Sequence, residues 1–313
     1  MDSVILTGAS GFIGRPCIEH LLEAGYTVHA LYHEENRSSP LPSREGLHWH
    51  RIDLLGDASH VASVIRPLQA SHMLHLAWYA EPGKFWDSRL NWEWLRASVQ
   101  LLKIFTESGG MRFVGAGTCA EYDWNGPGIL SESSPLNAAT LYGQCKSTLF
   151  QTAQQNATMS GVEFAWGRIF WLYGPGEDKS RLVPYVINAL LTDEEAHCSK
   201  GTQVRDFLYV NDVARAFVCL LNSKVQGAVN IGSGEGMTVK ALVEAIAKMI
   251  DKEHLLMVGA LLNEKAEAPI VVADTSRLKN ELGFKPEYGL DEGLRISMEW
   301  WRKGRARPPS MAR

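Results

Sequence analysis

The feature that most constrains the fold is a glycine-spaced turn at the start of the chain. The segment TGASGFIG places Gly8, Gly11 and Gly14 three residues apart, between a β-branched run and an amphipathic stretch. Glycine lets the backbone turn tightly and approach a pyrophosphate, which binds at the N-terminus of the following helix. In this strand–turn–helix context the spacing is typical of a dinucleotide site. Phe12 and Ile13, inside the turn, are therefore predicted cofactor contacts as well.

Short apolar runs alternate with amphipathic segments through the first two-thirds of the chain. Strands are predicted at 4–8, 27–32, 48–54, 72–78, 112–117 and 162–169, with helices between them that include 92–108 and 140–160. This alternation predicts a Rossmann-type, doubly wound α/β fold, with a parallel sheet covered by helices on both faces. Beyond Trp171 the pattern is less regular, with helical segments at 181–191, 210–223, 238–250 and 291–304.

Two domains are expected from this change of pattern. Residues 1–170 are expected to form the dinucleotide-binding domain. Residues 171–313 are expected to form mainly a smaller C-terminal α/β subdomain that binds the substrate, with segments around 205–231 returning to the first domain.

Composition narrows the class of function. The net charge of −4 gives no basic field for nucleic acid or an anionic membrane. The five cysteines form no CxxC pair, which argues against a metal site or a disulfide framework and fits a reducing cytoplasm. No apolar run reaches the ~18 residues of a membrane span, and the start MDSVILTGAS lacks the basic residues of a signal peptide. We therefore expect a cytoplasmic protein.

The segment LYGQCKS contains a tyrosine–lysine pair, Tyr142 and Lys146, on a predicted helix. Residues at i and i+4 share one face, about 5–6 Å apart at Cβ. A phenol with its ordinary pKa of ~10 is a poor acid–base group near neutrality. An adjacent ammonium favours the phenolate, so we expect Lys146 to lower the pKa of Tyr142. Lys146 can also hold the hydroxyls of a nicotinamide ribose.

Together with HLAW, GTCAEY, GRIFWLYGPGE, VRDFLYVNDVA, VNIGSGE and the tail DTSRLKNELGFKPEYGLDEGL, these motifs resemble the extended short-chain dehydrogenases/reductases of the nucleotide-sugar epimerase/dehydratase group. The resemblance covers nearly the whole chain. It implies a catalytic serine or threonine four residues before the tyrosine that follows the fifth strand, which is Thr118 before Tyr122. Thr118 would hydrogen-bond the reacting sugar oxygen and orient it toward Tyr142. Cys119 is expected to be a packing residue rather than a nucleophile.

The same resemblance argues against dehydration. The 4,6-dehydratases of the group carry an acid two residues before this tyrosine, where the present chain has Ala120. Glu121 is one position away, and in an extended segment its side chain would face the other side. Reductase–epimerases that use a cysteine carry it two residues before the tyrosine, whereas Cys119 is three before. Neither chemistry is therefore expected.

The choice of dinucleotide depends on the end of the second strand. Tyr32 stands there instead of the acid that usually binds the NAD ribose. His33 and Arg37 follow and could bind the 2′-phosphate of NADP, whereas Glu34 and Glu35 would repel it if they point inward. NADP is favoured, with NAD as the alternative.

Further cofactor contacts are predicted at the carboxyl ends of the strands and on the catalytic helix. Asp53 is expected near the adenine, with an exposed loop acid as the alternative. Besides the glycine turn, His33 and Arg37, the predicted set is Asp53, Leu54, Leu76, Ala77, Trp78, Tyr142 and Lys146.

Three residues of the second half are predicted substrate contacts. Arg205 matches the family arginine that holds the nucleotide-sugar pyrophosphate, for which a guanidinium fork is suited. The alternative is an ion pair with Asp206 or Asp212, both interpreted as structural. Trp171 stands where many relatives carry asparagine, so sugar or phosphate recognition is expected to differ. Arg181 is a weaker candidate for the diphosphate or base.

A tryptophan-rich segment, WYAEPGKFWDSRLNWEW, follows the fourth strand, whose carboxyl end should face the cofactor crevice. One interpretation is an aromatic wall, with Trp78 near the nicotinamide and Trp86 on the sugar or base. The other is packing of this segment against the body or a second subunit. By the resemblance, helices 92–108 and 140–160 would pair across a homodimer as a four-helix bundle.

Three functions are compatible with these motifs. The first is NAD(P)H-dependent reduction of the C4 ketone of a nucleotide-linked 4-keto-6-deoxyhexose, with Thr118, Tyr142 and Lys146 as catalytic residues. The second is an NAD-dependent nucleotide-sugar 4-epimerase with the same residues. The third, a catalytically silent NADP-binding scaffold, is disfavoured by the intact catalytic set. Absence of the second-strand acid and of the dehydratase acid favours the reductase.

Overall fold

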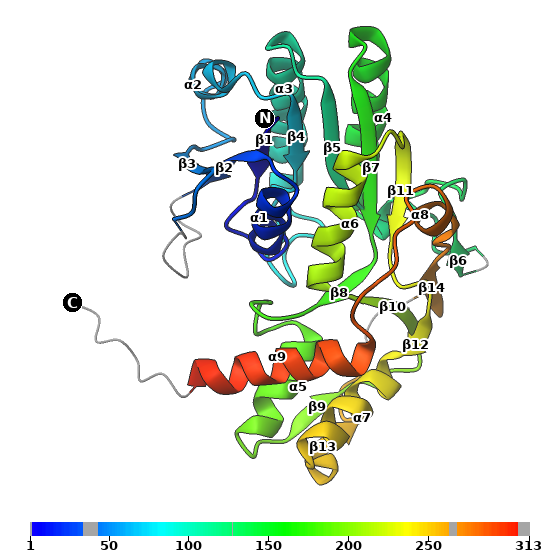
Figure 1. Cartoon of the computed structure of the whole chain (residues 1–313). Helices are drawn as coiled ribbons and strands as arrows, with labels where there is room; N and C mark the ends of the chain where they lie inside the picture. Colours follow the sequence, from blue (N-terminus) through cyan, green and yellow to red (C-terminus); the bar gives the residue numbers. More distant parts are fainter. Residues whose placement is uncertain (1, 34–42, 127, 263–267, 306–313) are drawn as a thin grey trace.

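Seven parallel strands form the central sheet of the computed structural model, which describes residues 2–33, 43–126, 128–262 and 268–305 (Figure 1). Their order is β11-β7-β5-β4-β1-β2-β3. The strands are β1 (Ser3–Thr7), β2 (Thr27–Tyr32), β3 (Leu47–Arg51), β4 (His72–His75), β5 (Arg112–Thr118), β7 (Glu163–Ile169) and β11 (Gly227–Ile231). The predicted Rossmann-type parallel sheet is confirmed, and each of the six predicted strands takes part in it.

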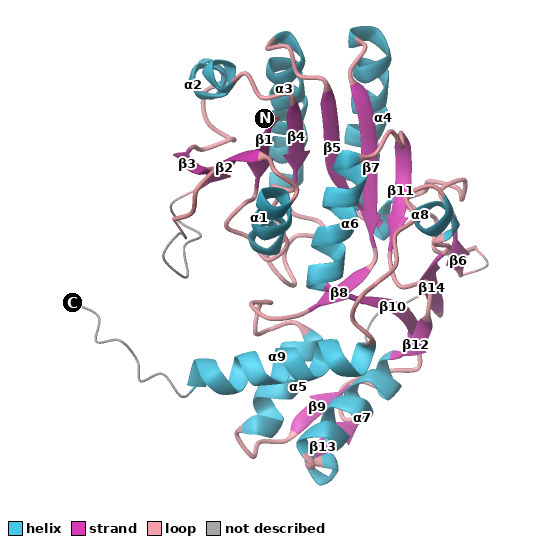
Figure 2. Ribbon diagram, in the orientation of Figure 1, coloured by secondary structure: helices cyan, strands magenta, loops and turns pink. Residues whose placement is uncertain are grey.

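Helices cover both faces of this sheet (Figure 2). Alternate residues of a strand point to opposite faces, and β1 shows the result. Leu6 packs in a core with α1 (Gly14–Glu23) and α6 (Val210–Asn222), whereas Ile5 packs in a second core with α3 (Leu90–Glu107) and α4 (Leu141–Ser160). The short helix α2 (Ala58–Ile65) contributes Val61 to the second core. Two apolar layers therefore hold the sheet from both sides.

A smaller α/β lobe follows the sheet. Its main sheet has the order β12-β10-β14-β6, and β8 also pairs with β10. These strands are β6 (Ile129–Leu130), β8 (Trp171–Tyr173), β10 (Val204–Tyr209), β12 (Gly236–Thr238) and β14 (Ile270–Ala273). A two-stranded sheet joins β9 (Ala196–Cys198) to β13 (Leu256–Val258). Helices α5 (Leu182–Leu191), α7 (Val239–Ile250) and α9 (Leu290–Arg305) share the core of this lobe, and α8 (Ser276–Asn280) lies beside β11.

The chain crosses several times between the seven-stranded sheet and the smaller lobe. β10 belongs to the smaller lobe. Of the next two elements, α6 packs against the seven-stranded sheet and β11 forms part of it. There β11 forms the edge of the seven-stranded sheet beside β7. The return to the seven-stranded sheet begins with α6, at Val210.

The long helices begin and end close to their predicted positions. α4 begins after Thr140, whose Oγ1 accepts a hydrogen bond from the Gly143 amide at 3.2 Å, as an N-cap does. α3 begins at Leu90 and ends at Glu107, one or two residues from the predicted bounds. Within the described ranges, no helix has both the length and the apolar character that crossing a membrane requires.

Candidate functional site

The glycine turn has the geometry of a dinucleotide cradle. Gly8 has a φ of +68°, and a Cβ there would lie 2.9 Å from the Ala77 amide nitrogen. A Cβ on Gly14 would overlap the Gly8 carbonyl, so helix α1 can approach the turn only with glycine there. Ile13 precedes α1 and provides no side-chain cap. Arg15 already donates its N–H to the Gly11 carbonyl at 3.1 Å and Pro16 has no N–H, so the Gly14 amide is the helical donor left for a phosphate. Phe12 packs toward the second lobe. These residues fit a bound pyrophosphate.

A buried polar chain beneath this turn was not predicted. Thr7 Oγ1 accepts hydrogen bonds from the Leu76 and Ala77 amides at 3.1 and 3.0 Å, and lies 2.8 Å from His75 Nδ1. His75 Nε2 lies 2.8 Å from Ser98 Oγ. Burial lowers the pKa of His75 to about 3, so its ring is neutral near pH 7. These hydrogen bonds hold the end of β1 to the residues that follow β4. Leu76 and Ala77, two of those residues, are predicted to contact the cofactor.

The structure brings the three predicted catalytic residues together at the carboxyl end of the sheet. Thr118 ends β5, and its side chain lies beside the Tyr142 phenol at the start of α4. One turn further along α4, the Lys146 Nζ donates to the Ala116 carbonyl at 2.8 Å. The same amine lies 3.9 Å from the centre of the Trp78 ring. The hydroxyl, the phenol and the amine therefore converge from β5 and α4.

The expected lowering of the tyrosine pKa is wrong. Burial raises the pKa of Tyr142 above its ordinary value, and the hydrogen bond from Thr118 and the charge of Arg181 oppose that rise. Burial also lowers the pKa of Lys146 to about 7, with Glu121 opposing. The lysine is therefore only partly charged near neutrality, unlike the fixed cation expected from the sequence.

The interpretation of Glu121 as part of an extended segment is also wrong. Residues 119–121 form a 3₁₀ turn that directs its fully buried carboxylate back into the core. Oε1 accepts from the Thr118 amide and from Trp166 Nε1, both at 2.9 Å, while Oε2 accepts from Arg168 Nε at 2.8 Å. Gly117 leaves the space that this arrangement needs, since a Cβ there would lie 2.6 Å from Glu121 Oε1. Glu121 thus holds Thr118 from behind.

The buried polar contacts continue away from Glu121. Arg168 Nη1 donates to the Tyr122 hydroxyl at 3.1 Å, and that hydroxyl donates to Asn230 Oδ1 at 2.6 Å. The main-chain N–H of Asn230 donates to Glu132 Oε1 at 2.7 Å. Sequence reasoning missed this network, although an arginine inside the apolar strand VEFAWGRI was its signal. Cys119, beside it, is buried, and burial raises the pKa of its thiol, as a packing residue requires.

Aromatic side chains surround Tyr142. The rings of Phe85, Trp86 and Trp78 lie edge-on to it, with centroids 4.8, 5.9 and 6.5 Å away. The Tyr142 amide also donates to the Trp86 carbonyl at 2.9 Å. Trp92, by contrast, is 54% exposed on α3. The tryptophan-rich segment therefore divides between residues that adjoin Tyr142 and a residue on the surface.

Arg205 and Trp171 lie together in the second lobe. The buried Arg205 donates from Nη1 to two main-chain carbonyls at 2.9 and 2.8 Å, and its guanidinium lies 4.9 Å from the centre of the Trp171 ring. Trp124 lies 5.9 Å from the same ring. The Asp206 carboxylate accepts from amides of residues 233, 234 and 273, and Asp212 accepts from those of residues 287 and 288. Both acids thus have structural roles.

The predicted adenosine contacts lie at the ends of the outer strands. His33 directly follows β2 and is half-buried. Asp53 is exposed after β3, and its Oδ1 accepts from the Leu55 amide at 2.9 Å, as an acid in a loop does. Leu54 packs toward the core beneath α2 and α3. Arg37 lies outside the described residues.

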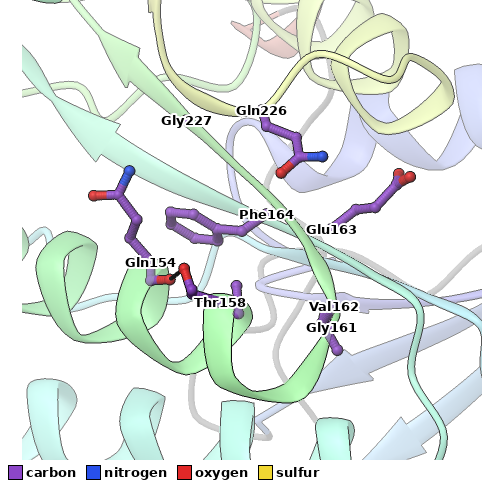
Figure 3. A pocket seen from close by; sticks show the side chains of 9 residues that line it. Gln154, Thr158, Gly161, Val162, Glu163, Phe164, Gln226 and Gly227 are labelled. Atoms are coloured by element: carbon purple, nitrogen blue, oxygen red, sulfur yellow. Dashed lines mark hydrogen bonds between the residues drawn. The ribbon is translucent and has the colours of Figure 1, made fainter.

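Figure 3 shows a surface pocket that is separate from this site. It has a volume of about 300 Å³ and lies between the C-terminal turns of α4 and the first residues of β7 and β11. Its lining includes Gln154, Thr158, Glu163 and Gln226. These strand starts are at the amino ends of the sheet, whereas Thr118 and Tyr142 lie at the carboxyl ends. The pocket is therefore not part of the catalytic arrangement.

Comparison with known proteins identifies the family of the chain. Residues 4–232 match the model of the NAD dependent epimerase/dehydratase family. The chain is similar to the CDP-abequose synthase of Salmonella typhimurium (26% identity, covering 94% of this chain and 96% of the other) and to the UDP-glucose 4-epimerase of Bacillus subtilis (27% identity, 95% and 96%). It also resembles the structure of the Thermus thermophilus UDP-glucose 4-epimerase complex with NAD (TM-score 0.84, 25% identity, 96% and 99%). The chain therefore belongs to the NAD-dependent epimerase/dehydratase family and is an enzyme of the extended short-chain dehydrogenase/reductase type.

Proposed function

We propose that the protein reduces the C4 ketone of a nucleotide-linked 4-keto-6-deoxyhexose. The observation that carries this proposal is the environment of Thr118. The hydroxyl and the phenol needed for carbonyl chemistry lie beside each other. The nearest acid, Glu121, is buried in an ion pair with Arg168, and Ala120 occupies the position of the dehydratase acid. This arrangement supports hydride chemistry at C4 and leaves no acid for elimination of water at this turn.

The chain's own residues would orient the ketone and deliver a proton to it. When bound, the dinucleotide supplies the hydride. The Thr118 hydroxyl donates a hydrogen bond to the ketone oxygen and holds it near Tyr142. Burial raises the pKa of Tyr142, so its phenol stays protonated near neutrality. It gives up that proton only as hydride transfer makes the ketone oxygen strongly basic. The flanking rings of Trp78 and Trp86 limit the access of water to this proton transfer.

The dinucleotide we propose is NADP, with NAD as the alternative. Tyr32, at the end of β2, packs edge-on against Trp49 at 5.9 Å and offers no carboxylate for a ribose hydroxyl. The half-buried His33 follows and can face a 2′-phosphate. The similar Thermus thermophilus 4-epimerase forms a complex with NAD, which supports the alternative. Titration with NADPH and NADH distinguishes the two, since much tighter binding of NADH would reject the histidine argument.

We also propose a homodimer through α3 and α4. These helices pack against each other on one face of the sheet, and α3 carries the exposed Trp92. Two such pairs would form a four-helix bundle. Light scattering on the eluting protein should give twice the chain mass of 34.7 kDa, and a monomer at micromolar concentration would reject the proposal.

The second candidate function is nucleotide-sugar 4-epimerisation, which the similarity to 4-epimerases supports. Both functions use the same three residues, so the assay must separate them. A CDP- or dTDP-linked 4-keto-6-deoxyglucose is incubated with NADPH or NADH, and absorbance at 340 nm is followed. The reductase consumes one equivalent of reductant for each ketone. The epimerase instead interconverts UDP-glucose and UDP-galactose without added reductant.

The role of Tyr142 is tested in the same assay. Tyr142→Phe should lose at least 100-fold in turnover, because a positioned proton donor contributes about 10²–10⁴-fold. The matched control is Tyr185→Phe, which removes the hydroxyl of a half-exposed tyrosine on α5 whose contact is the His197 amide. Retention of most activity by Tyr142→Phe would show that another group donates the proton.

A further inference from the structure

The turn that follows β8 carries an acid, Glu177, and an arginine, Arg181, whose guanidinium lies near the rings around the predicted catalytic tyrosine. Its main chain is fixed by hydrogen bonds from the Glu177 amide to the Gly174 carbonyl (3.3 Å) and from the Arg181 amide to the Asp178 carbonyl (3.0 Å). The intervening residues, 178–180, are exposed, whereas Glu177 and Arg181 are half-buried. These two side chains therefore fold back onto the protein while their neighbours face solvent.

The Glu177 carboxyl group has an unused oxygen. Its Oε2 is shielded from solvent and has no hydrogen-bond partner among the described residues. Buried polar atoms in native proteins are nearly always paired, so an unpaired one needs an explanation. Burial raises the pKa of Glu177 to about 8, and the charge of Arg181 opposes the rise. The carboxyl group is thus held in a shielded place without a protein partner.

Arg181 connects this acid to the aromatic residues around Tyr142. Its guanidinium lies 5.3 Å from the centre of the Phe85 ring, which in turn lies 4.8 Å from the ring of Tyr142. Its charge lowers the pKa of both Glu177 and Tyr142, so it is near each of them. Yet within the described part of the chain no salt bridge of 4 Å or less joins Arg181 to Glu177. The nearby guanidinium therefore leaves Glu177 Oε2 unpaired.

We propose that Glu177 and Arg181 bind the hexose ring beside its reacting carbon. Glu177 Oε2 accepts a hydrogen bond from a ring hydroxyl, and the Arg181 guanidinium donates to a neighbouring sugar oxygen. Arg181 thereby acts on the sugar, while Arg205, beside Trp171, is left to the diphosphate. This inference rests on the proposed nucleotide-sugar function. It adds that the turn after β8 binds the hexose part of the ligand.

The test compares free nucleotides with their sugar conjugates. Calorimetric titrations of the full chain, saturated with dinucleotide, use UDP, CDP and dTDP and then UDP-glucose, CDP-glucose and dTDP-glucose. For the pair that the wild type binds, Glu177→Leu, which removes the acceptor oxygen, should weaken the glucose conjugate about 10-fold and leave the free nucleotide unchanged within about 2-fold. Glu194→Leu, the same substitution at an exposed acid just beyond the C-terminal end of α5, should change neither.

The other outcomes overturn either the assignment of Glu177 to the sugar or the proposed nucleotide-sugar function. Equal affinity of wild type and Glu177→Leu for the conjugate overturns the inference. An equal loss for nucleotide and conjugate also overturns it, because the turn would then act on the diphosphate or on folding. If Glu177→Leu does not fold by circular dichroism, Arg181→Lys takes its place, with the same selective loss expected. If the wild type binds none of the six ligands, the proposed nucleotide-sugar function itself fails.

Discussion

Removing the carboxylate behind Thr118 should be the most damaging single change to stability in the active region. Glu121 and Arg168 are 0% and 1% exposed, and Glu121 accepts three hydrogen bonds. Glu121→Leu leaves the guanidinium charge and two N–H donors buried without an acceptor. Breaking a buried ion pair from one side costs about 3–5 kcal/mol, and each unpaired buried donor about 1–3 kcal/mol. Because these terms overlap, we expect a loss of at least about 3 kcal/mol in the free energy of unfolding.

The measurement is urea denaturation followed by tryptophan fluorescence and far-ultraviolet circular dichroism, with coincident transitions as the check on two-state behaviour. The double variant Glu121→Leu/Arg168→Met removes both charges and should recover most of the loss. Glu107→Gln is the control, because its pair with Arg66 is 45% and 59% exposed and such surface pairs contribute about 0–1 kcal/mol.

Two results would refute this reasoning. The first is a loss below about 1 kcal/mol for Glu121→Leu, which would mean that the pair is solvated or easily replaced. The second is a double variant whose loss equals the sum of the two single losses, which would show that the two side chains do not interact.

Three further predictions concern the same region. Gly117→Ala would place a Cβ 2.1 Å from Trp166 Nε1 and 2.6 Å from Glu121 Oε1. We therefore expect the free energy of unfolding in urea to fall by about 1–3 kcal/mol, and an unchanged value would mean that Trp166 moves freely. Gly14→Ala would push the start of α1 away from the Gly8 carbonyl, so dinucleotide affinity measured by calorimetry should fall about 10-fold or more, whereas Gly304→Ala, with no neighbour in the way, should keep it. Because burial lowers the pKa of Lys146 to about 7, the unfolded chain binds one more proton from there up to its ordinary value of ~10.4. Stability should therefore rise with pH over that window by up to about 1.4 kcal/mol per unit relative to Lys146→Met, and parallel urea profiles from pH 7 to 9 would contradict it.

The sequence predicts the parallel sheet because its strand and helix patterns repeat over a few residues. It predicts the convergence of Thr118, Tyr142 and Lys146 because their motifs are also local in the sequence. Strand and helix periods repeat within a few residues, and a helix places Tyr142 and Lys146 on one face regardless of its surroundings. The carboxyl-end rule for parallel sheets then locates Thr118 beside them. None of these steps needs the packing of the whole molecule.

The electrostatics could not be predicted in the same way. The contact of Glu121 with Arg168 joins residues 47 positions apart and depends on a 3₁₀ turn that the alternation pattern does not reveal. The pKa of Tyr142 depends on how deeply Phe85 and Trp86 cover it, and those rings come from a loop without periodicity. Burial acts on both members of the tyrosine–lysine pair, so a rule taken from exposed charges predicts the wrong direction.

The position of β11 at the edge of the large sheet limits how this chain can be divided. A fragment that stops at residue 170 keeps the glycine turn and all three predicted catalytic residues but loses α6 and β11. Strand β7 would then carry a row of unpaired main-chain groups, which is a template for pairing with another molecule. The apolar side chains that Phe217 and Leu221 of α6 cover would also meet water. An independently folding cofactor-binding fragment therefore has to be built by grafting residues 210–231 back onto the amino-terminal part, and a simple truncation is expected to aggregate.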